Sequence, residues 1–239
     1  MTFQKLDHNS ENTVNNMNEK KIDSVKAANT QDGSKTIFSP NFNEHYHSIN
    51  GAFTETMHIF VGLGYNSIPL KNINILEIGY GTGLNAICTY LENVNSGKQI
   101  FYHGIEKYPL DMKVLNSLNY SEICKVEEHA LGPFFKEWNK RVKIDEYFTL
   151  YKQVIDFQQF KPEQRYDLIY FDAFSPDVQP EMWSFENLEK ILTALSTGGV
   201  FVTYCSRGDL KRSLRALGME VKRFSGPPGK RHVIRATKQ

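Results

Sequence analysis

The chain has 239 residues, which is enough for one α/β domain with a substantial hydrophobic core. Hydrophobic residues make up 40% of it and charged residues 23%, which are ordinary proportions for a globular protein. No apolar run approaches the roughly 20 residues that a membrane-spanning helix needs, and the first residues lack the pattern of a secretory signal. We therefore expect a cytoplasmic protein that does not enter a membrane.

The cysteine spacing argues against a disulfide framework. Cys88, Cys124 and Cys205 are far apart and odd in number, and no pair has the spacing of a zinc site. We expect these thiols to be reduced and structural, and we predict no bound metal.

The charge is unevenly distributed along the chain, although the formal net charge is only +1. Residues 205–239 contain ten Lys or Arg and two Asp or Glu, so the remainder of the chain is mildly acidic. A basic terminus of this kind suits binding to nucleic-acid phosphates. A solvated charged face on a terminal helix and hairpin is the alternative interpretation.

The first 35 residues are polar and rich in Asn, Lys and Ser, with no sustained hydrophobic period. We predict a flexible N-terminal segment over residues 1–35 and one domain over residues 36–239. Within that domain, residues 54–64 have the apolar stripe and the closing glycine of a short helix.

The rest of the chain alternates strands and helices, which is typical of a doubly wound parallel sheet. Apolar runs predict strands at 75–78, 100–105, 148–155, 166–172 and 199–205. Helical spacing predicts helices at 84–92, 111–118, 184–197 and 209–217. Residues 220–224 and 232–236 can pair as an antiparallel hairpin. The predicted fold is α/β and Rossmann-like, a doubly wound, mostly parallel sheet with an antiparallel C-terminal hairpin.

The most informative motif follows the first of these strands. Gly79, Gly81 and Gly83 alternate with other residues, and their missing side chains let a ligand approach backbone N–H groups. A dinucleotide fingerprint would need its third glycine at Leu84, so a dehydrogenase is disfavoured. The spacing Glu77-x-Gly79-x-Gly81-x-Gly83 is instead the form seen in methyltransferases that use S-adenosyl-L-methionine. A glycine-rich turn that binds nothing is the alternative for the loop alone.

The next predicted strand ends in Glu106. An acid in this place can accept hydrogen bonds from two ribose hydroxyls. We predict that Glu106 binds the ribose of S-adenosyl-L-methionine, although a strand-end Glu is by itself often only a solvated carboxylate.

A second acidic site follows the strand at 166–172. Asp172 begins the run Asp-Ala-Phe-Ser-Pro at 172–176, which is similar to segments with which methyltransferases hold a nitrogen nucleophile. Methyl transfer moves positive charge onto that nitrogen, so a carboxylate can orient the amine and stabilise the arriving charge. Aromatic faces such as those of Tyr80 and Phe174 can line the path of the cation. Asp172 is therefore the predicted catalytic residue, and a loop anchor is the alternative.

The same carboxylate creates a conflict. Its charge raises the pKa of a neighbouring amine, and so favours the protonated, unreactive form. Asp172 must therefore either take the proton or act on an amine whose pKa is already low.

Several segments between about residue 36 and the C-terminus match one bacterial family. The most specific are Glu-Lys-Tyr-Pro-Leu at 106–110 and the combination of the 172–176 run with Pro-Glu-Met-Trp at 180–183. Further matches lie at 39–42, 81–85 and 229–231. Together they resemble the methyltransferase half of the bifunctional tRNA-modifying MnmC family, which completes 5-methylaminomethyl-2-thiouridine at the wobble position of certain tRNAs.

The resemblance implies an S-adenosyl-L-methionine-dependent N-methyltransferase that acts on the 5-aminomethyl group of a wobble uridine in tRNA. It implies cofactor-binding roles for Glu77, Gly79, Tyr80, Gly81, Gly83, Asn85, Glu106 and Lys107. The family usually has an acid on the adenine side of the cofactor, after the third strand. This chain has Lys152-Gln153-Val154 there, and Asp156, two residues later, is a weak assignment for that role. Substrate-binding roles are implied for Glu55, Phe174, Pro176, Lys230 and Arg231. For Glu55 and its neighbours, a helix-capping role is the alternative.

The family's flavin-dependent oxidoreductase half has no counterpart in this sequence, so we expect a stand-alone methyltransferase whose aminomethyl substrate comes by another route. Two other functions stay open. An aminopropyltransferase of the polyamine-synthase type has a related fold but a small diamine substrate, and it would not need the basic C-terminal stretch. A non-catalytic RNA-binding scaffold would bind tRNA without consuming S-adenosyl-L-methionine.

Overall fold

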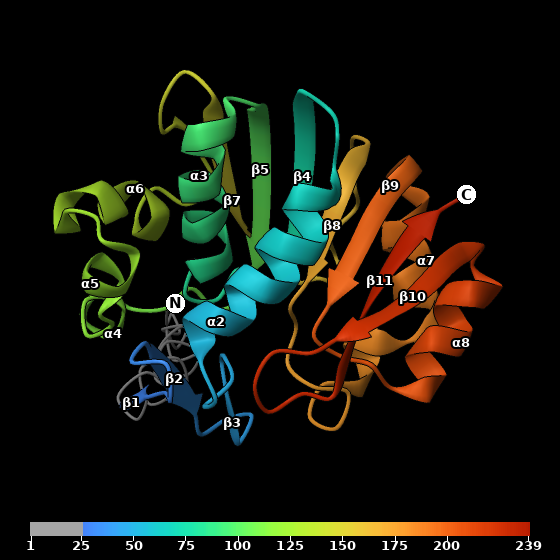
Figure 1. Cartoon of the computed structure of the whole chain (residues 1–239), viewed down its shortest axis with the longest axis horizontal. Coiled ribbons are helices and arrows are strands. Elements are labelled where there is room, and N and C mark those ends of the chain that lie inside the picture. Colours follow the sequence, from blue (N-terminus) through green and yellow to red (C-terminus); the bar gives the residue numbers. More distant parts are fainter. Residues whose placement is uncertain (1–25) are drawn as a thin grey trace, which may run out of the picture.

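The computed structural model describes residues 26–239. An eight-stranded sheet crosses the molecule with the strand order β10-β11-β9-β8-β4-β5-β7-β6 (Figure 1). Its five central strands are parallel: β4 (Asn72–Ile78), β5 (Gln99–Glu106), β7 (Phe148–Val154), β8 (Tyr166–Phe171) and β9 (Leu195–Thr203). The predicted α/β, doubly wound sheet is confirmed.

Antiparallel strands close both edges of this sheet. At one edge β6 (Arg141–Lys143) pairs with β7. At the other edge β11 (His232–Lys238) pairs with β9, and β10 (Met219–Ser225) pairs with β11. The predicted C-terminal hairpin is thus confirmed, and it continues the sheet.

The order of the strands reverses between β4 and β8. From β4 the chain moves outward through β5 and β7, and it then returns to build β8 and β9 on the other side. Connections diverge at such a switch point, which leaves a crevice beyond the carboxyl ends of the strands. The loop after β4 and the loop after β8 therefore meet at the place where α/β proteins bind their ligands.

Both faces of the sheet are covered. On β4, Ile73 and Ile75 belong to one hydrophobic cluster, whereas Leu76 and Ile78 belong to the other. Alternate side chains of this strand thus supply both clusters, and the apolar residues of β4 lie on both of its faces.

The helices divide between the two faces (Figure 1). The first cluster is covered by α2 (Ala52–Thr56), its continuation η1 (Met57–Gly64) and α3 (Leu84–Ser96). The second is covered by α7 (Phe185–Thr193) and α8 (Gly208–Ala216). The short elements are η2 (Tyr65–Ser67), α4 (Met112–Leu115), α5 (Tyr120–Cys124), η3 (Glu128–Leu131), α6 (Gly132–Phe135) and η4 (Pro180–Trp183). Within residues 26–239, no helix has the length and apolar character that a membrane span requires.

The helix predicted over residues 184–197 was wrong at its end. In the structure α7 stops at Thr193 and β9 begins at Leu195. The apolar spacing continues to Leu195, so periodicity alone does not reveal the boundary. Leu195 is instead the partner of Tyr166 in β8, which shows that strand pairing overrides the local helical pattern here.

A small three-stranded sheet precedes the large one. It consists of β1 (Lys26–Asn29), β2 (Lys35–Ser39) and β3 (Glu44–His45). The boundary predicted between residues 35 and 36 falls inside β2. Residues 1–25, the larger part of the segment predicted to be flexible, lie outside the described residues.

The central strand β5 depends on a glycine for its packing. A Cβ at Gly104 would overlap the ring of Tyr80. We expect Gly104→Ala to lower the free energy of unfolding by about 1–3 kcal/mol through overpacking, as measured by urea denaturation. Gly132→Ala is the matched control, because its backbone is helical and a Cβ there meets no atom within 4 Å. An equal loss of stability in the two variants would contradict the packing argument.

Candidate active site

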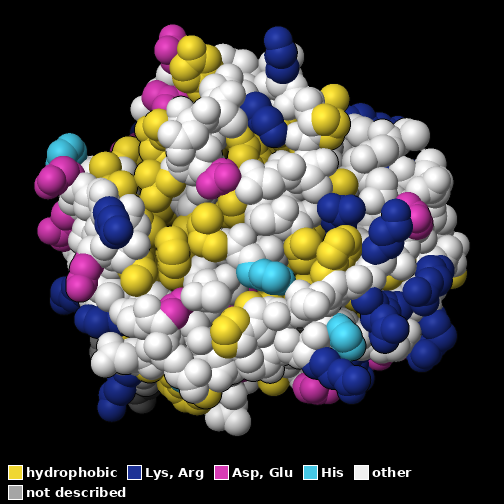
Figure 2. All heavy atoms as spheres, in the orientation of Figure 1, with side chains coloured by type: hydrophobic (Ala, Val, Ile, Leu, Met, Phe, Trp, Pro, Cys, Tyr) yellow, Lys and Arg dark blue, Asp and Glu magenta, His cyan; other side chains and the backbone are white. Residues whose placement is uncertain are grey.

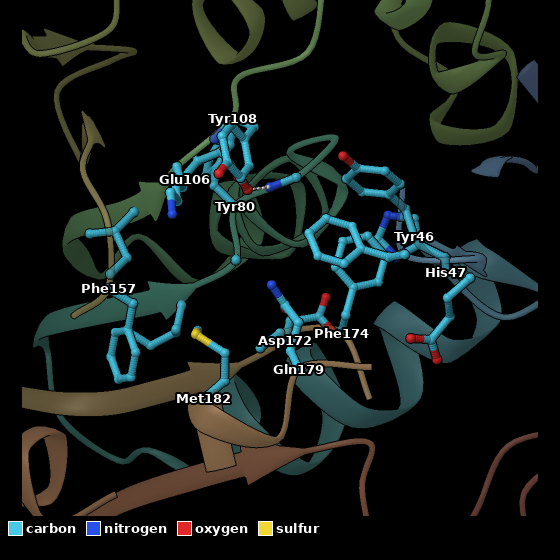
Figure 3. Close-up of a pocket in the computed structure, with 18 of the residues that line it drawn as sticks. Tyr46, His47, Tyr80, Glu106, Tyr108, Phe157, Asp172, Phe174, Gln179 and Met182 are labelled. Carbon is cyan, nitrogen blue, oxygen red and sulfur yellow. Dashed lines mark hydrogen bonds between the residues drawn. The ribbon is translucent and has the colours of Figure 1, made fainter. Parts of the chain in front are cut away.

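The carboxyl ends of the parallel strands open into a cavity of about 520 Å³ (Figure 3). Its walls come from the loop after β4, the end of β5, the residues that follow β7, the loop after β8, and residues 42–49 in and around β3. Lys230, from the loop between β10 and β11, completes the wall. A cavity of this volume is suitable for a nucleoside-sized ligand.

The glycine loop after β4 has the conformation that its sequence predicts. Gly79 and Gly81 have φ angles of +85° and +53°, which L residues with side chains rarely adopt. A Cβ on Gly79 would lie 2.6 Å from the backbone oxygen of Asp172, and one on Gly81 would lie 3.1 Å from the ring of Tyr46. Because these glycines have no side chains, the loop lies close to Asp172 and Tyr46, and its backbone faces the cavity.

Glu106 lies at the tip of β5, next to this loop (Figure 3). Its Oε2 accepts a hydrogen bond from the Gly81 backbone N–H at 3.0 Å, and its Oε1 accepts one from the Tyr108 N–H at 2.9 Å. Burial raises the pKa of Glu106, and the backbone hydrogen bonds act in the opposite direction. Each carboxylate oxygen retains a further lone pair, so a ribose diol is a chemically suitable partner.

Lys107 and Asp156 form an ion pair at the rim of the cavity. The Lys107 Nζ lies 2.7 Å from Asp156 Oδ2, and both residues are among those that line the cavity. The ammonium group beside it lowers the pKa of Asp156. The structure thus brings both predicted residues to the rim of the cavity, in contact with each other.

Glu77 and Asn85 lie beneath the floor of the cavity. Asn85 Nδ2 donates hydrogen bonds to Glu77 Oε1 and to Asp172 Oδ2, each at 2.8 Å. The Asn85 Oδ1 accepts a bond from the Thr56 hydroxyl at 2.9 Å, and Tyr102 donates to the other Glu77 oxygen at 2.8 Å. Neither Glu77 nor Asn85 lines the cavity, and neither does Gly83. The structure therefore places Glu77 and Asn85 where they hold other site residues.

Tyr80 turns its side chain into the core. Its ring is 3% exposed, and its hydroxyl donates a hydrogen bond to the Phe134 carbonyl at 2.9 Å. Lys152 donates to the same carbonyl at 2.7 Å, and burial lowers the pKa of this lysine to about 7. Tyr80 therefore supports the glycine loop from below, through a contact with Lys152 and Phe134 that the sequence did not indicate.

Asp172 is the acid at the centre of the cavity (Figure 3). Burial raises its pKa to about 8, and the charge of Glu55 acts in the same direction. The hydrogen bond from Asn85 and the charge of Lys230 act against this rise. Glu77, below it, has a pKa well above its ordinary value, first because of burial and then because of Asp172.

Aromatic side chains line the same cavity as Asp172. The ring of Phe174 stacks on Phe42 with centroids 4.4 Å apart, and it meets the edge of Tyr46 at 5.0 Å. Trp183 fixes this loop by donating its indole N–H to the Phe174 carbonyl at 2.8 Å. The predicted substrate residue Phe174 thus belongs to an aromatic wall that faces the cavity.

Lys230 points into the cavity. Its Nζ lies 2.8 Å from Glu55 Oε2 and 5.0 Å from the centre of the Tyr204 ring. Pro176 and Arg231 do not line this cavity. They line a shallower neighbouring depression of about 390 Å³, and Lys230 contributes to the walls of both.

Basic side chains of the C-terminal stretch gather on one part of the surface. Figure 2 shows Lys and Arg side chains gathered over the part of the molecule that holds α8 and the β10–β11 hairpin. Its exposed cations are Arg207, Arg212, Arg215, Lys222, Arg223 and Arg231. Part of this charge is already neutralised, because Arg207 pairs with Asp177 at 2.7 Å.

The sequence did not reveal the part that the N-terminal sheet plays in the site. Tyr46 and His47 lie against the glycine loop (Figure 3), and His47 Nε2 is 2.8 Å from Thr82 Oγ1, within hydrogen-bond distance. Burial lowers the pKa of His47 to about 4. The available signal was the unusual density of aromatic and histidine residues at 36–50. Within residues 26–239, no cluster of His, Cys, Asp and Glu has a metal-binding arrangement.

The doubly wound sheet, the glycine loop and Glu106 define a nucleoside-cofactor enzyme of the methyltransferase class. Residues 121–239 match the model of a family described as S-adenosyl-L-methionine-dependent methyltransferase. Over these residues the chain is similar to that family, and the protein is a methyltransferase that uses S-adenosyl-L-methionine as its cofactor.

Relatives of known name agree with the motifs. The tRNA 5-methylaminomethyl-2-thiouridine biosynthesis bifunctional protein MnmC of Nitrosospira multiformis is 28% identical over 219 residues, which is 83% of this chain and 34% of that protein. The MnmC protein of Campylobacter hominis is 30% identical over 211 residues, covering 84% of this chain and 31% of that one. The chain thus spans about a third of the length of the curated relatives that it matches. The predicted resemblance to this family is confirmed.

A solved structure has the same fold. MnmC2 from Aquifex aeolicus superimposes with a TM-score of 0.69 at 24% identity, over 95% of this chain and 77% of that one. At this identity the likeness establishes the Rossmann-like architecture, which the sheet topology shows independently.

The glycine loop makes a testable contribution to cofactor affinity. We expect Gly81→Val to abolish measurable binding of S-adenosyl-L-methionine in calorimetric titration, because a branched side chain would enter the space between the loop and Tyr46. Gly97→Val is the matched control: this glycine also has a positive φ, of +61°, but a Cβ there meets no atom within 4 Å and the residue does not line the cavity. Unchanged affinity in a folded Gly81→Val variant would refute the assignment of the loop.

Proposed function

We propose that this protein methylates the primary amine of the 5-aminomethyl group of a wobble uridine, or 2-thiouridine, in tRNA. The product is the 5-methylaminomethyl nucleoside whose biosynthesis gives the MnmC relatives their name. The observation that carries the proposal is a single cavity in which Glu106 and the glycine loop face Asp172, Phe174 and Glu55. We further propose that the reaction takes place in the cytoplasm and that the catalytic domain begins near residue 36.

On the cofactor side, Glu106 would hold the ribose, and the backbone of Gly79 and Gly81 would lie against the ligand. Lys107 and Asp156 would lie next to the far end of the cofactor, at the rim of the cavity. When bound, S-adenosyl-L-methionine supplies an electrophilic methyl group. The tasks left to the protein are to orient the amine, to exclude water and to dispose of a proton.

On the amine side, Asp172 has a pKa suited to this last task. An aminomethyl group is protonated in water, and only its neutral form has a free lone pair. A carboxyl group whose pKa is raised to about 8 is a better match for an amine proton than an ordinary aspartate, because acid–base transfer is most effective when the two pKa values are close. Asp172 would accept an N–H hydrogen bond, take the proton and pass it to solvent.

Asp172 also remains close to the nitrogen as positive charge arrives there. Asn85 keeps the carboxylate oriented through its hydrogen bond to Oδ2. The aromatic wall of Phe42, Tyr46 and Phe174 presents π faces, which stabilise a cation and also stack on a nucleobase. The geometry therefore supports N-methylation of a base-linked amine.

The reaction itself is tested by incubating the protein with labelled S-adenosyl-L-methionine and tRNA from cells that lack this modification, followed by nucleoside analysis. Label in 5-methylaminomethyl nucleosides is the expected result. Transfer to no RNA nucleoside would overturn the proposal, and cofactor-dependent modification of a free diamine would favour an aminopropyltransferase.

Asp172 should dominate the rate of the chemical step. We expect Asp172→Asn to lower the methylation rate by roughly 10²-fold or more, since it removes both the proton acceptor and the charge. In the unaltered protein kcat/KM should rise with pH and level off above about 8, where Asp172 is ionised in the free protein. This rise should be lost or displaced in the Asn variant.

The stability of the Asn variant provides the control. Because the folded-state pKa of Asp172 is raised, the folded protein binds a proton that the unfolded chain has released, and stability falls as pH increases from about 4 to about 8. Asp172→Asn should therefore resist thermal unfolding at pH 8 at least as well as the original protein. If the variant stays folded and methylates at the original rate across this pH range, Asp172 only anchors its loop and takes no part in the reaction.

The basic surface should contribute to RNA affinity. We expect Arg231→Ala to weaken tRNA binding and to lower the slope of log affinity against log salt by about one unit, if the guanidinium neutralises one phosphate. Lys140→Ala is the control, since Lys140 lies in an exposed ion pair with Glu137 and lines neither depression. Equal affinities and equal slopes for the two variants would show that Arg231 belongs to a solvated charged face and contacts no RNA phosphate.

A further inference from the structure

The ammonium group of Lys230 occupies an unusual position for a residue of a basic surface. It lies inside the catalytic cavity, 2.8 Å from Glu55 Oε2, and its side chain is only 26% exposed. Glu55 is more deeply buried still, with 9% of its side chain exposed. The ring of Tyr204 lies 5.0 Å from the same Nζ. One cation is thus held by a buried carboxylate and an aromatic face.

The surroundings of this cation extend to Asp172. The charge of Lys230 lowers the pKa of Asp172, whereas that of Glu55 raises it, so the three charges interact across the cavity. Tyr204 is held in place by its own hydroxyl, which donates a hydrogen bond to the Ala173 carbonyl at 2.9 Å. The site therefore combines two carboxyl groups with a fixed aromatic ring, which are the groups that bind a primary ammonium ion.

We propose that Glu55, Asp172 and Tyr204 form a recognition site for the primary ammonium group of the substrate, and that Lys230 occupies this site in the free protein. The inference rests on the proposed function for the identity of the substrate amine. It assigns Lys230 a different role from a simple phosphate ligand: its side chain competes with the substrate's ammonium group for the same carboxylate.

Lys230 can move from Glu55 into the shallower depression beside the cavity. Lys230 lines the wall between the cavity and the shallower depression, which also contains Arg231 and His232. An RNA phosphate in that depression would attract the lysine away from Glu55. The arrival of the RNA backbone would then open the ammonium site, and a free nucleoside without phosphates would have to displace the lysine unaided.

This competition has a measurable consequence. If Lys230 fills the ammonium site, the apparent affinity for a free aminomethyl nucleoside is reduced by the fraction of molecules in which the site is open. Removing the lysine charge should relieve the reduction only for a ligand that carries a primary ammonium group. A neutral ligand of the same shape does not compete for Glu55 and should not gain.

The experiment compares two probes, 5-aminomethyluridine and 5-hydroxymethyluridine, by calorimetric titration of the full chain saturated with S-adenosyl-L-homocysteine. Lys230→Met keeps the aliphatic stem and removes the charge. We expect it to bind 5-aminomethyluridine about tenfold more tightly than the original protein, with little change for 5-hydroxymethyluridine. Lys230→Arg keeps a cation in place and should show no gain, and Lys140→Met is the control for loss of a surface lysine.

A second substitution tests the recognition site itself. Adding Glu55→Gln to Lys230→Met should remove the preference for the ammonium probe, because the carboxylate that selects it is gone. Equal affinity changes for the two probes, or a gain with Lys230→Arg as large as with Lys230→Met, would overturn the proposal. These titrations involve no turnover, so they are read separately from the labelling experiment. If tRNA is methylated but Lys230→Met gains nothing, this inference alone fails.

Discussion

The hydrogen bonds from Asn85 to Glu77 and Asp172 are the interaction on which the rest of the site depends. They join the end of β4, the start of α3 and the end of β8 at the point where the strand order reverses. The two N–H groups of one amide are both used, and its oxygen is held by Thr56 from α2. The position of the Asp172 carboxylate is therefore set by buried elements of the sheet and its helices.

Acidic side chains gather in the cavity and beneath its floor. Glu55, Glu77, Glu106 and Asp172 come from four different elements, and burial raises the pKa of the last three. Water cannot solvate these groups fully, so the protein neutralises them by protonation, by backbone N–H groups or by Lys230. S-adenosyl-L-methionine carries a positive charge on its sulfonium group. A pocket of partly neutralised acids is thus electrostatically suited to this cationic cofactor.

The N-terminal segment around β3 contacts both loops of the site. Tyr46 rests on Gly81, His47 contacts Thr82, and Glu44 accepts a hydrogen bond from the Ser175 N–H at 3.0 Å. These contacts join the segment to both the glycine loop and the loop after β8. It forms a wall of the cavity, and part of the aromatic lining comes from it.

The sequence by itself determined the features that depend on local pattern. Runs rich in apolar residues indicated the parallel strands, because a strand covered on both faces buries side chains on both sides. The alternating glycines gave the turn after β4, because their positive φ angles exclude most other residues. From these, Glu106 and Asp172 followed as the acids at neighbouring strand ends. The end of α7 was predicted too late, because Leu195 fits the helical spacing of α7 and is also the first buried residue of β9.

Only the tertiary structure decided which groups meet across the cavity. Lys230 and Arg231 are adjacent in a basic run, yet one reaches Glu55 inside the cavity and the other lies in the outer depression. Glu77 and Asn85 belong to the glycine motif, yet both lie below the floor. The direction of a side chain and its partner depend on backbone turns and on residues distant in sequence. Local patterns carry no information about such contacts, because their energy arises only when the packed elements bring the groups together.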